Sequence, residues 1–69
     1  MFRQDNPKRK GSNAYKRYEV YKYAKDEIDY EFIWKKSKNN CIDGFDETSA
    51  TWKTDLRYDK WKGYIISSS

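Results

Sequence analysis

Apolar side chains recur at helical spacing early in this 69-residue chain. Tyr18 and Tyr21 fall on one stripe of a helix, with cationic and polar residues around them. Ser12 or Asn13 stands before the stripe, and either side chain can accept a hydrogen bond from a first-turn amide. The pattern therefore predicts a first helix over residues 13–25.

Residues 26–36 predict a second helix. Acidic side chains come first and Lys35 and Lys36 come last, an order that complements the helix dipole at both ends. A strand is the alternative because residues 30–34 are rich in β-forming side chains, but their apolar run breaks the alternation of a half-buried strand. We therefore expect a helix, and its broad apolar face comprises Ile28, Tyr30, Phe32, Ile33 and Trp34.

A third helix is predicted over residues 50–62. Thr48 or Ser49 can cap its start, and Gly63 suits its end because glycine adopts the left-handed conformation without strain. Leu56 belongs to its inward stripe, together with a tryptophan one turn earlier.

The connection at residues 37–48 is dense in Asn, Asp and Gly, which favour turns. We expect Ile42 and Phe45 to attach it to the core, and Cys41 to be a small buried apolar side chain. After the third helix, residues 64–66 predict a short apolar segment that folds back on the body.

These elements predict a mainly α fold, a small three-helix bundle of helix-turn-helix-like character over residues 13–66. Residues 1–12 hold a Lys-Arg-Lys triplet between a proline and a glycine, and they lack a pattern that builds a core. We expect them to form a flexible basic arm, and residues 67–69 to form a disordered tail.

Composition makes the expected core aromatic. The chain has one leucine and one valine, but seven Tyr, three Trp and three Phe. Each aromatic side chain buries roughly 150–250 Å², so we expect a shallow aromatic core with hydroxyls at its rim. A chain this short buries only about 60% of the surface that its unfolded form exposes. We therefore expect marginal stability, with a partner or self-association adding to it.

Several classes of function are disfavoured. A single cysteine and no histidine exclude an intramolecular disulfide and a four-ligand zinc site, which favours a reducing intracellular compartment. No apolar run approaches the roughly 20 residues that span a bilayer. Asp55 and Asp59, one helical turn apart, are a weak metal signal, and salt bridges to basic residues of the first helix are the better interpretation. Without a nucleophile–base pair or a glycine-rich phosphate loop, we expect no enzymatic activity, metal, cofactor or small-molecule substrate.

Charge is distributed unevenly and indicates a polyanionic partner. Residues 1–25 hold eight basic and two acidic side chains, a balance of +6, whereas residues 26–69 hold seven basic and nine acidic, a balance of −2. On the third helix, basic residues recur at i, i+4 and i+7 beside Trp52 and Leu56, although a solvated surface is an alternative interpretation. The predicted nucleic-acid-binding residues are Lys8, Arg9, Lys10, Lys16, Arg17, Lys53, Arg57 and Lys60.

DNA is the expected partner, bound mainly through phosphates. The same cations permit RNA binding, and nothing in the sequence separates the two. The alternative function is a structural or adaptor role, in which the aromatic surface and the basic arm contact another protein or a second copy of the chain.

Both ends of the chain carry a resemblance to a known family. The string NPKRKGS at residues 6–12 and RYE at 17–19 resemble the start of short modules encoded by large DNA viruses of algae and their relatives. DLRYD at residues 55–59 and GYI at 63–65 resemble the end of the same modules. The matches cover about half of the chain. Residues 37–48 depart from the pattern, because the family has a short turn around Leu-Gly-Ala there, and a longer turn changes the angle between the helices.

The resemblance implies a small helical bundle of helix-turn-helix character, with residues 55–62 in its last helix. It also implies a viral protein that handles DNA, in the host nucleus or cytoplasm or in the virion. The long connection argues against standard helix-turn-helix docking on DNA.

Overall fold

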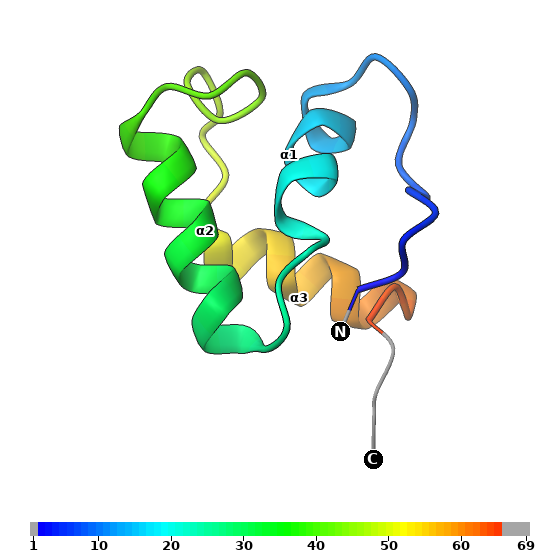
Figure 1. Cartoon of the computed structure of the whole chain (residues 1–69). Helices are drawn as coiled ribbons and strands as arrows, with labels where there is room; N and C mark the ends of the chain where they lie inside the picture. Colours follow the sequence, from blue (N-terminus) through cyan, green and yellow to red (C-terminus); the bar gives the residue numbers. More distant parts are fainter. Residues whose placement is uncertain (1, 66–69) are drawn as a thin grey trace.

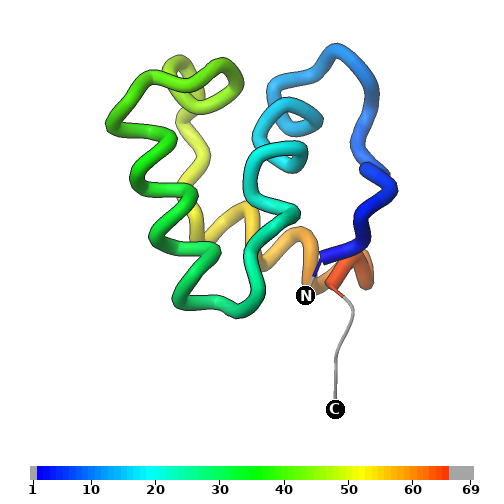
Figure 2. Tube along the Cα trace, in the orientation of Figure 1, coloured from blue at the N-terminus to red at the C-terminus, as the bar shows by residue number. Residues whose placement is uncertain are grey.

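The computed structural model describes residues 2–65 of the chain. Three helices follow one another: α1 (Asn13–Tyr21), α2 (Glu27–Asn39) and α3 (Trp52–Lys62). α1 and α2 stand side by side, and α3 crosses the pair at a steep angle (Figure 1). The tube in Figure 2 shows the N-terminal segment running along the far side of α1 from the end of α3. The predicted mainly α three-helix bundle is confirmed.

Capping side chains mark where the first two helices begin. The Ser12 hydroxyl accepts from the Tyr15 amide at 3.1 Å, as predicted for an N-cap. Asp26 does not belong to the second helix: its backbone is extended, and its carboxylate caps α2 by accepting from the Asp29 amide. α1 ends at Tyr21, four residues before the predicted end, and Lys22 is its C-cap.

The preference for a helix over a strand in the second element is confirmed. α2 carries acidic residues in its first turn and basic residues in its last, and it continues to Asn39, three residues beyond the predicted end. α3 ends as predicted at Gly63, whose φ of 76° lies in the left-handed region.

The start of α3 differs from the prediction. Thr51 is the N-cap, and it forms a reciprocal capping box in which Thr51 and Thr54 each accept from the other's backbone amide. The expected caps, Thr48 or Ser49, are wrong. The Thr48 hydroxyl instead accepts from the Arg17 guanidinium at 3.1 Å and from the Ala50 amide at 3.2 Å, which precedes the helix.

The core is aromatic, as the composition predicted. Phe2, Tyr18, Tyr21 and Tyr30 pack with ring centroids 5.0–5.9 Å apart, within the range of favourable aromatic pairs. The hydroxyls are not confined to the rim: that of Tyr21 is buried. No buried side-chain polar atom of residues 2–65 lacks a hydrogen-bond partner, so the polar tips cost little. The buried hydrophobic residues are Phe2, Tyr18, Tyr21, Ala24, Tyr30, Trp34, Phe45 and Leu56.

The N-terminal segment (residues 2–12) lies against the helices, and the expectation of a free arm without core residues is wrong. Phe2 is only 2% exposed, and it forms an isolated antiparallel bridge with Ile65. The Arg3 amide donates to the Tyr64 carbonyl at 3.0 Å. The predicted fold-back of the C-terminal apolar segment is therefore confirmed at residues 64–65, whereas residue 66 and the predicted tail at 67–69 lie outside the described residues.

The connection between α2 and α3 packs against α1. Phe45 is fully buried, as predicted, but Ile42 is 40% exposed and Cys41 is exposed rather than buried. Cys41 has a φ of 53°, so it occupies a turn on the surface. Gly44, with a φ of 96°, lies so close to α1 that a Cβ there would be 2.7 Å from the Cβ of Lys16.

The apolar face of α2 is narrower than predicted. Tyr30 and Trp34 are buried and Ile33 is partly buried. Ile28 and Phe32 are 83% and 63% exposed. These two side chains point away from α1 and α3, because the short helices α1 and α3 cover only one side of α2.

Candidate nucleic-acid interface

The eight predicted nucleic-acid-binding residues fall into two groups. Four are held in ion pairs by the protein's own carboxylates, and these are Lys8, Lys16, Arg17 and Lys60. The other four are exposed and take part in no ion pair with the residues that the structure describes, and these are Arg9, Lys10, Lys53 and Arg57.

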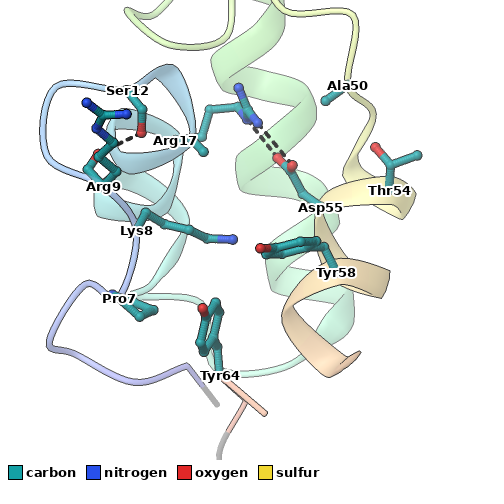
Figure 3. A pocket seen from close by; sticks show the side chains of 11 residues that line it. Pro7, Lys8, Arg9, Ser12, Arg17, Ala50, Thr54, Asp55, Tyr58 and Tyr64 are labelled. Carbon is teal, nitrogen blue, oxygen red and sulfur yellow. Dashed lines mark hydrogen bonds and ion pairs between the residues drawn. The ribbon is translucent and has the colours of Figure 1, made fainter. Parts of the chain in front are cut away.

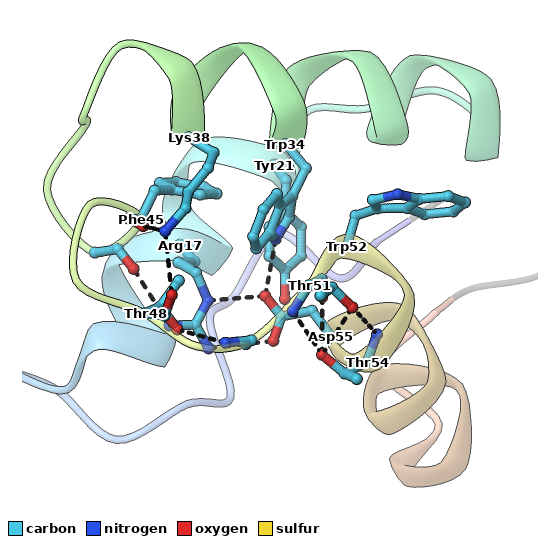
Figure 4. A network of polar contacts seen from close by, with 12 residues as sticks. Arg17, Tyr21, Trp34, Lys38, Phe45, Thr48, Thr51, Trp52, Thr54 and Asp55 are labelled. Atoms are coloured by element: carbon cyan, nitrogen blue, oxygen red, sulfur yellow. Dashed lines mark hydrogen bonds and ion pairs between the residues drawn. The ribbon is translucent and has the colours of Figure 1, made fainter.

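Arg17 is a structural residue, and its assignment to phosphate binding is wrong. Its Nε and Nη2 donate to both Asp55 oxygens, at 2.8 and 3.1 Å, and its Nη1 donates to the Gly44 carbonyl and to Thr48 (Figure 4). The Trp34 indole donates to the same carboxylate at 2.9 Å. One bidentate pair therefore joins α1, α2, α3 and the connection. The predicted salt bridge between Asp55 and the first helix is confirmed.

Lys8 is also withdrawn from solvent, and its assignment to phosphate binding is wrong as well. Its Nζ donates to Asp59 Oδ1 at 2.5 Å, and the two side chains are 10% and 0% exposed. The Nζ lies 4.4 Å from the Tyr58 ring centroid and 5.1 Å from that of Tyr64, within cation–π range (Figure 3). The salt bridge of Asp59 is therefore with the N-terminal segment and not with a basic residue of the first helix.

Asp59 has a second partner, which explains how a carboxylate is tolerated with no solvent access. The Tyr21 hydroxyl donates to Asp59 Oδ2 at 2.6 Å. Burial raises the pKa of Asp59, and the hydrogen bonds from Lys8 and Tyr21 oppose that rise. The Lys8–Asp59 pair anchors the N-terminal segment to the inner face of α3.

The ion pairs of Lys16 and Lys60 are on the surface. Lys16 lies 3.1 Å from Asp43, with side chains 40% and 77% exposed, and Lys60 lies 2.6 Å from Glu27, with both side chains 54% exposed. Exposed pairs of this kind contribute roughly 0–1 kcal/mol. Either lysine can therefore exchange its carboxylate for a phosphate at low cost, but neither is a free charge.

The outward side of α3 gathers the free cations of that helix. Arg57 lies between two hollows, of about 310 and 290 Å³, that run along the helix surface. Lys53 lines the second hollow, and Tyr58 and Trp61 line the first. Neither hollow is lined by a carboxylate.

A cleft of about 480 Å³ links this surface to the N-terminal segment (Figure 3). Arg9 lines the cleft on one side, and Thr54 and Tyr58 line it on the other. Thr54 and Tyr58 also line the first hollow with Arg57. Arg9 and Arg57 therefore border one continuous stretch of surface, although they come from distant parts of the chain.

Sequence reasoning missed three residues of this surface: Tyr58, Trp61 and Lys62. Trp61 is 74% exposed and Tyr58 is 45% exposed. The Lys62 Nζ lies 4.7 Å from the Trp61 ring centroid. The spacing of Trp61 four residues after Arg57 was the available signal, because i and i+4 side chains share a helix face.

No free carboxylate of residues 2–65 belongs to α3 or to the turn at residues 9–10. Carboxylates without an ion pair among residues 2–65 are in the N-terminal turns of α2 and in the connection, and these are Asp26, Asp29, Asp46 and Glu47. The fold thus leaves α3 and the 9–10 turn with cations that are not compensated locally.

The fold and the surface define a small three-helix bundle with an exposed helix that carries cations and aromatic rings. A scan against protein-family models finds no matching family, and searches of curated proteins and of solved structures find no significant match. The resemblance to viral modules therefore stays a prediction. None of the helices in residues 2–65 has the length and apolar character needed to cross a membrane.

Proposed function

We propose that this protein binds DNA without enzymatic activity, through the outward side of α3 and the neighbouring turn of the N-terminal segment. The observation that carries the proposal is the continuous surface on which Arg9 and Arg57 face solvent around Thr54 and Tyr58. Lys53 extends the positive charge along α3, and the exposed Lys10 follows Arg9 in the chain. Because no carboxylate lines the hollows on α3, Lys53 and Arg57 are available to phosphates.

The number of free cations sets how steeply the affinity for DNA should fall with salt. With four phosphates engaged, the affinity for duplex DNA should fall by about 150-fold between 50 and 200 mM salt, and that for single strands by about 50-fold, because each contact releases roughly 0.9 or 0.7 counterion. Affinity for a 20-nucleotide DNA, measured by fluorescence anisotropy in both forms, tests this. A loss smaller than about 5-fold in both forms would refute the proposal. Tighter binding of the RNA of the same sequence would overturn the choice of DNA.

Matched charge variants locate the surface. The double variant Lys53→Gln/Arg57→Gln removes two expected contacts, so the salt slope for duplex DNA should drop by about 1.8. The control is Lys25→Gln/Lys36→Gln, which changes the net charge equally at exposed positions away from α3. Equal effects of the two double variants would mean that binding follows net charge and not this surface.

A protein-contact role, in a virion or as an adaptor, is the second candidate function. The observation that favours it is the exposed pair Ile28 and Phe32 on the outer side of α2, next to a hollow of about 620 Å³. Asp29 and Lys36 lie towards opposite ends of α2, and neither is in an ion pair among the described residues. A second copy of α2 in antiparallel orientation would therefore place each charge opposite its counterpart.

Sedimentation equilibrium tests this second role. Phe32→Glu should abolish self-association, whereas Tyr23→Glu, at a side chain that is 66% exposed outside this pair, should leave it intact. A wild-type protein that stays monomeric at millimolar concentration would refute self-association through α2.

A further inference from the structure

The hollow formed by Tyr58 and Trp61 on α3 has the properties of a ring-binding site. Their ring centroids are 5.8 Å apart at an interplanar angle of 70°. Thr54 and Arg57 complete the lining of about 310 Å³. The two rings meet edge to face, so the hollow is lined by aromatic surface with one cation beside it.

Trp61 has no evident structural role. Its side chain is 74% exposed, and it is not among the residues packed against the core of the described chain. An exposed indole keeps a large apolar surface in water. This surface is stabilised when a flat apolar partner covers it.

Two cations near the rings indicate the charge of that partner. Lys62 Nζ lies 4.7 Å from the Trp61 centroid and 5.9 Å from that of Tyr58. Arg57 lines the hollow, and no carboxylate does. A partner that carries a flat ring between negative groups fits this arrangement.

The Thr54 hydroxyl of the hollow is not free to read base edges in a duplex. The Thr54 hydroxyl accepts from the Thr51 amide at 2.8 Å and donates to the Thr51 carbonyl at 2.9 Å, so the capping box already uses it. In a duplex the faces of the bases are stacked on one another, and only their edges reach a groove. Ring faces such as those of Trp61 and Tyr58 need an unstacked base.

From these contacts we infer that the Tyr58–Trp61 hollow binds an unpaired nucleobase of single-stranded DNA, with the flanking phosphates on Arg57 and Lys62. The inference rests on the proposed DNA-binding function and specifies its ligand class. Stacking needs no particular base, because every base has a π face. The site therefore favours single strands over duplexes without selecting a sequence.

The experiment compares two probes with the full chain at 50 mM salt. The first is a fluorescein-labelled 15-nucleotide single strand, and the second is the same strand annealed to its complement. Trp61→Ala should weaken single-strand binding by about 5- to 150-fold, the range for removing one stacking side chain. Trp61→Phe should restore most of that loss, and duplex binding should be unchanged in both variants.

The control is Tyr23→Ala, which removes another exposed aromatic side chain, 66% exposed, outside α3. It should leave both affinities unchanged. Because Trp61 is exposed, its variants should keep the wild-type helical circular dichroism spectrum.

Two results would overturn the inference while leaving the proposed function in place: an equal loss on both probes, or no loss on either. A wild-type protein that binds neither probe at 50 mM salt would overturn both proposals. Binding of the single strand that depends on Trp61 but not on Tyr23 supports the inference.

Discussion

Replacing Arg17 by methionine should bring the protein close to unfolding at room temperature. The change leaves Asp55, whose side chain is 13% exposed, without its bidentate cation and with only the Trp34 indole as a donor. Removing one member of a buried ion pair costs about 3–5 kcal/mol, because the remaining charge stays desolvated. A domain of 69 residues has a total stability of roughly 3–10 kcal/mol, so this loss is a large part of the whole.

Urea denaturation, followed by far-ultraviolet circular dichroism and tryptophan fluorescence, measures the loss. The matched control is Lys16→Met, which breaks an ion pair on the same helix whose side chains are 40% and 77% exposed. That variant should lose no more than about 1 kcal/mol. The contrast compares a buried, multiply hydrogen-bonded cation with an exposed one, since both changes remove one cation from α1.

A rescue variant tests the reason for the loss. Arg17→Met/Asp55→Asn removes the unpaired charge and keeps an oxygen that accepts from Trp34, so it should be more stable than Arg17→Met alone. The reasoning is refuted if Arg17→Met costs no more than Lys16→Met. It is also refuted if Asp55→Asn in the Arg17→Met background lowers stability further.

Three other changes test separate features by urea denaturation. Gly44→Ala should destabilise the protein by more than 2 kcal/mol, because it combines a left-handed φ, which costs about 1–2 kcal/mol, with a 2.7 Å approach to Lys16 Cβ. Gly63→Ala is the control: a Cβ there has nothing within 4 Å, so it should cost only the ~1–2 kcal/mol of the left-handed φ. Equal losses in the two variants would contradict the close packing at Gly44. Phe2→Ala should cost about 3–5 kcal/mol as a buried aromatic truncation, whereas a loss under 1 kcal/mol would place the N-terminal segment outside the folded core. Because burial raises the pKa of Asp59 above its usual 3.8, the folded state binds more protons than the unfolded state just above that pH, and stability from this group falls as pH rises. The advantage of wild type over Asp59→Asn should therefore shrink as the pH increases from 3.8, and an advantage that grows would mean that the pKa is lowered instead.

Local signals in the sequence predicted the helices well. Ser12 and Gly63 act through neighbours within a few residues, so their roles are visible in the linear chain. The periodic burial of Tyr18 and Tyr21 is equally local, because both face one side of a single helix. The caps and the periodic apolar positions together were enough to predict a mainly α fold.

Features that depend on distant contacts were missed. Phe2 looks like part of a polar tail until the end of α3 returns to it as a partner. Thr48 contacts Arg17, which lies 31 residues away along the chain, and nothing in the local sequence indicates that contact. Cys41 was expected to be buried by residue type, but its position in a surface turn exposes it.

The candidate site was predictable only in part, for the same reason. Lys8 and Arg9 are adjacent and chemically alike, yet one is bound to Asp59 and the other lines an open cleft. Lys8 is bound because α3 places the Asp59 carboxylate inside the fold, next to Lys8. A count of basic residues therefore overestimates the charge available to a partner.

The two buried ion pairs also determine which side of α3 is free. Asp55 and Asp59 are one turn apart, and their cations come from α1 and from the N-terminal segment. Any rotation of α3 about its axis would break both pairs, so its orientation is firmly held. Arg57 and Trp61, also one turn apart, lie on the opposite side and are held facing solvent by the same contacts. A variant that loosens either pair should therefore weaken the proposed DNA binding, and the weakening should follow the loss of folded α3.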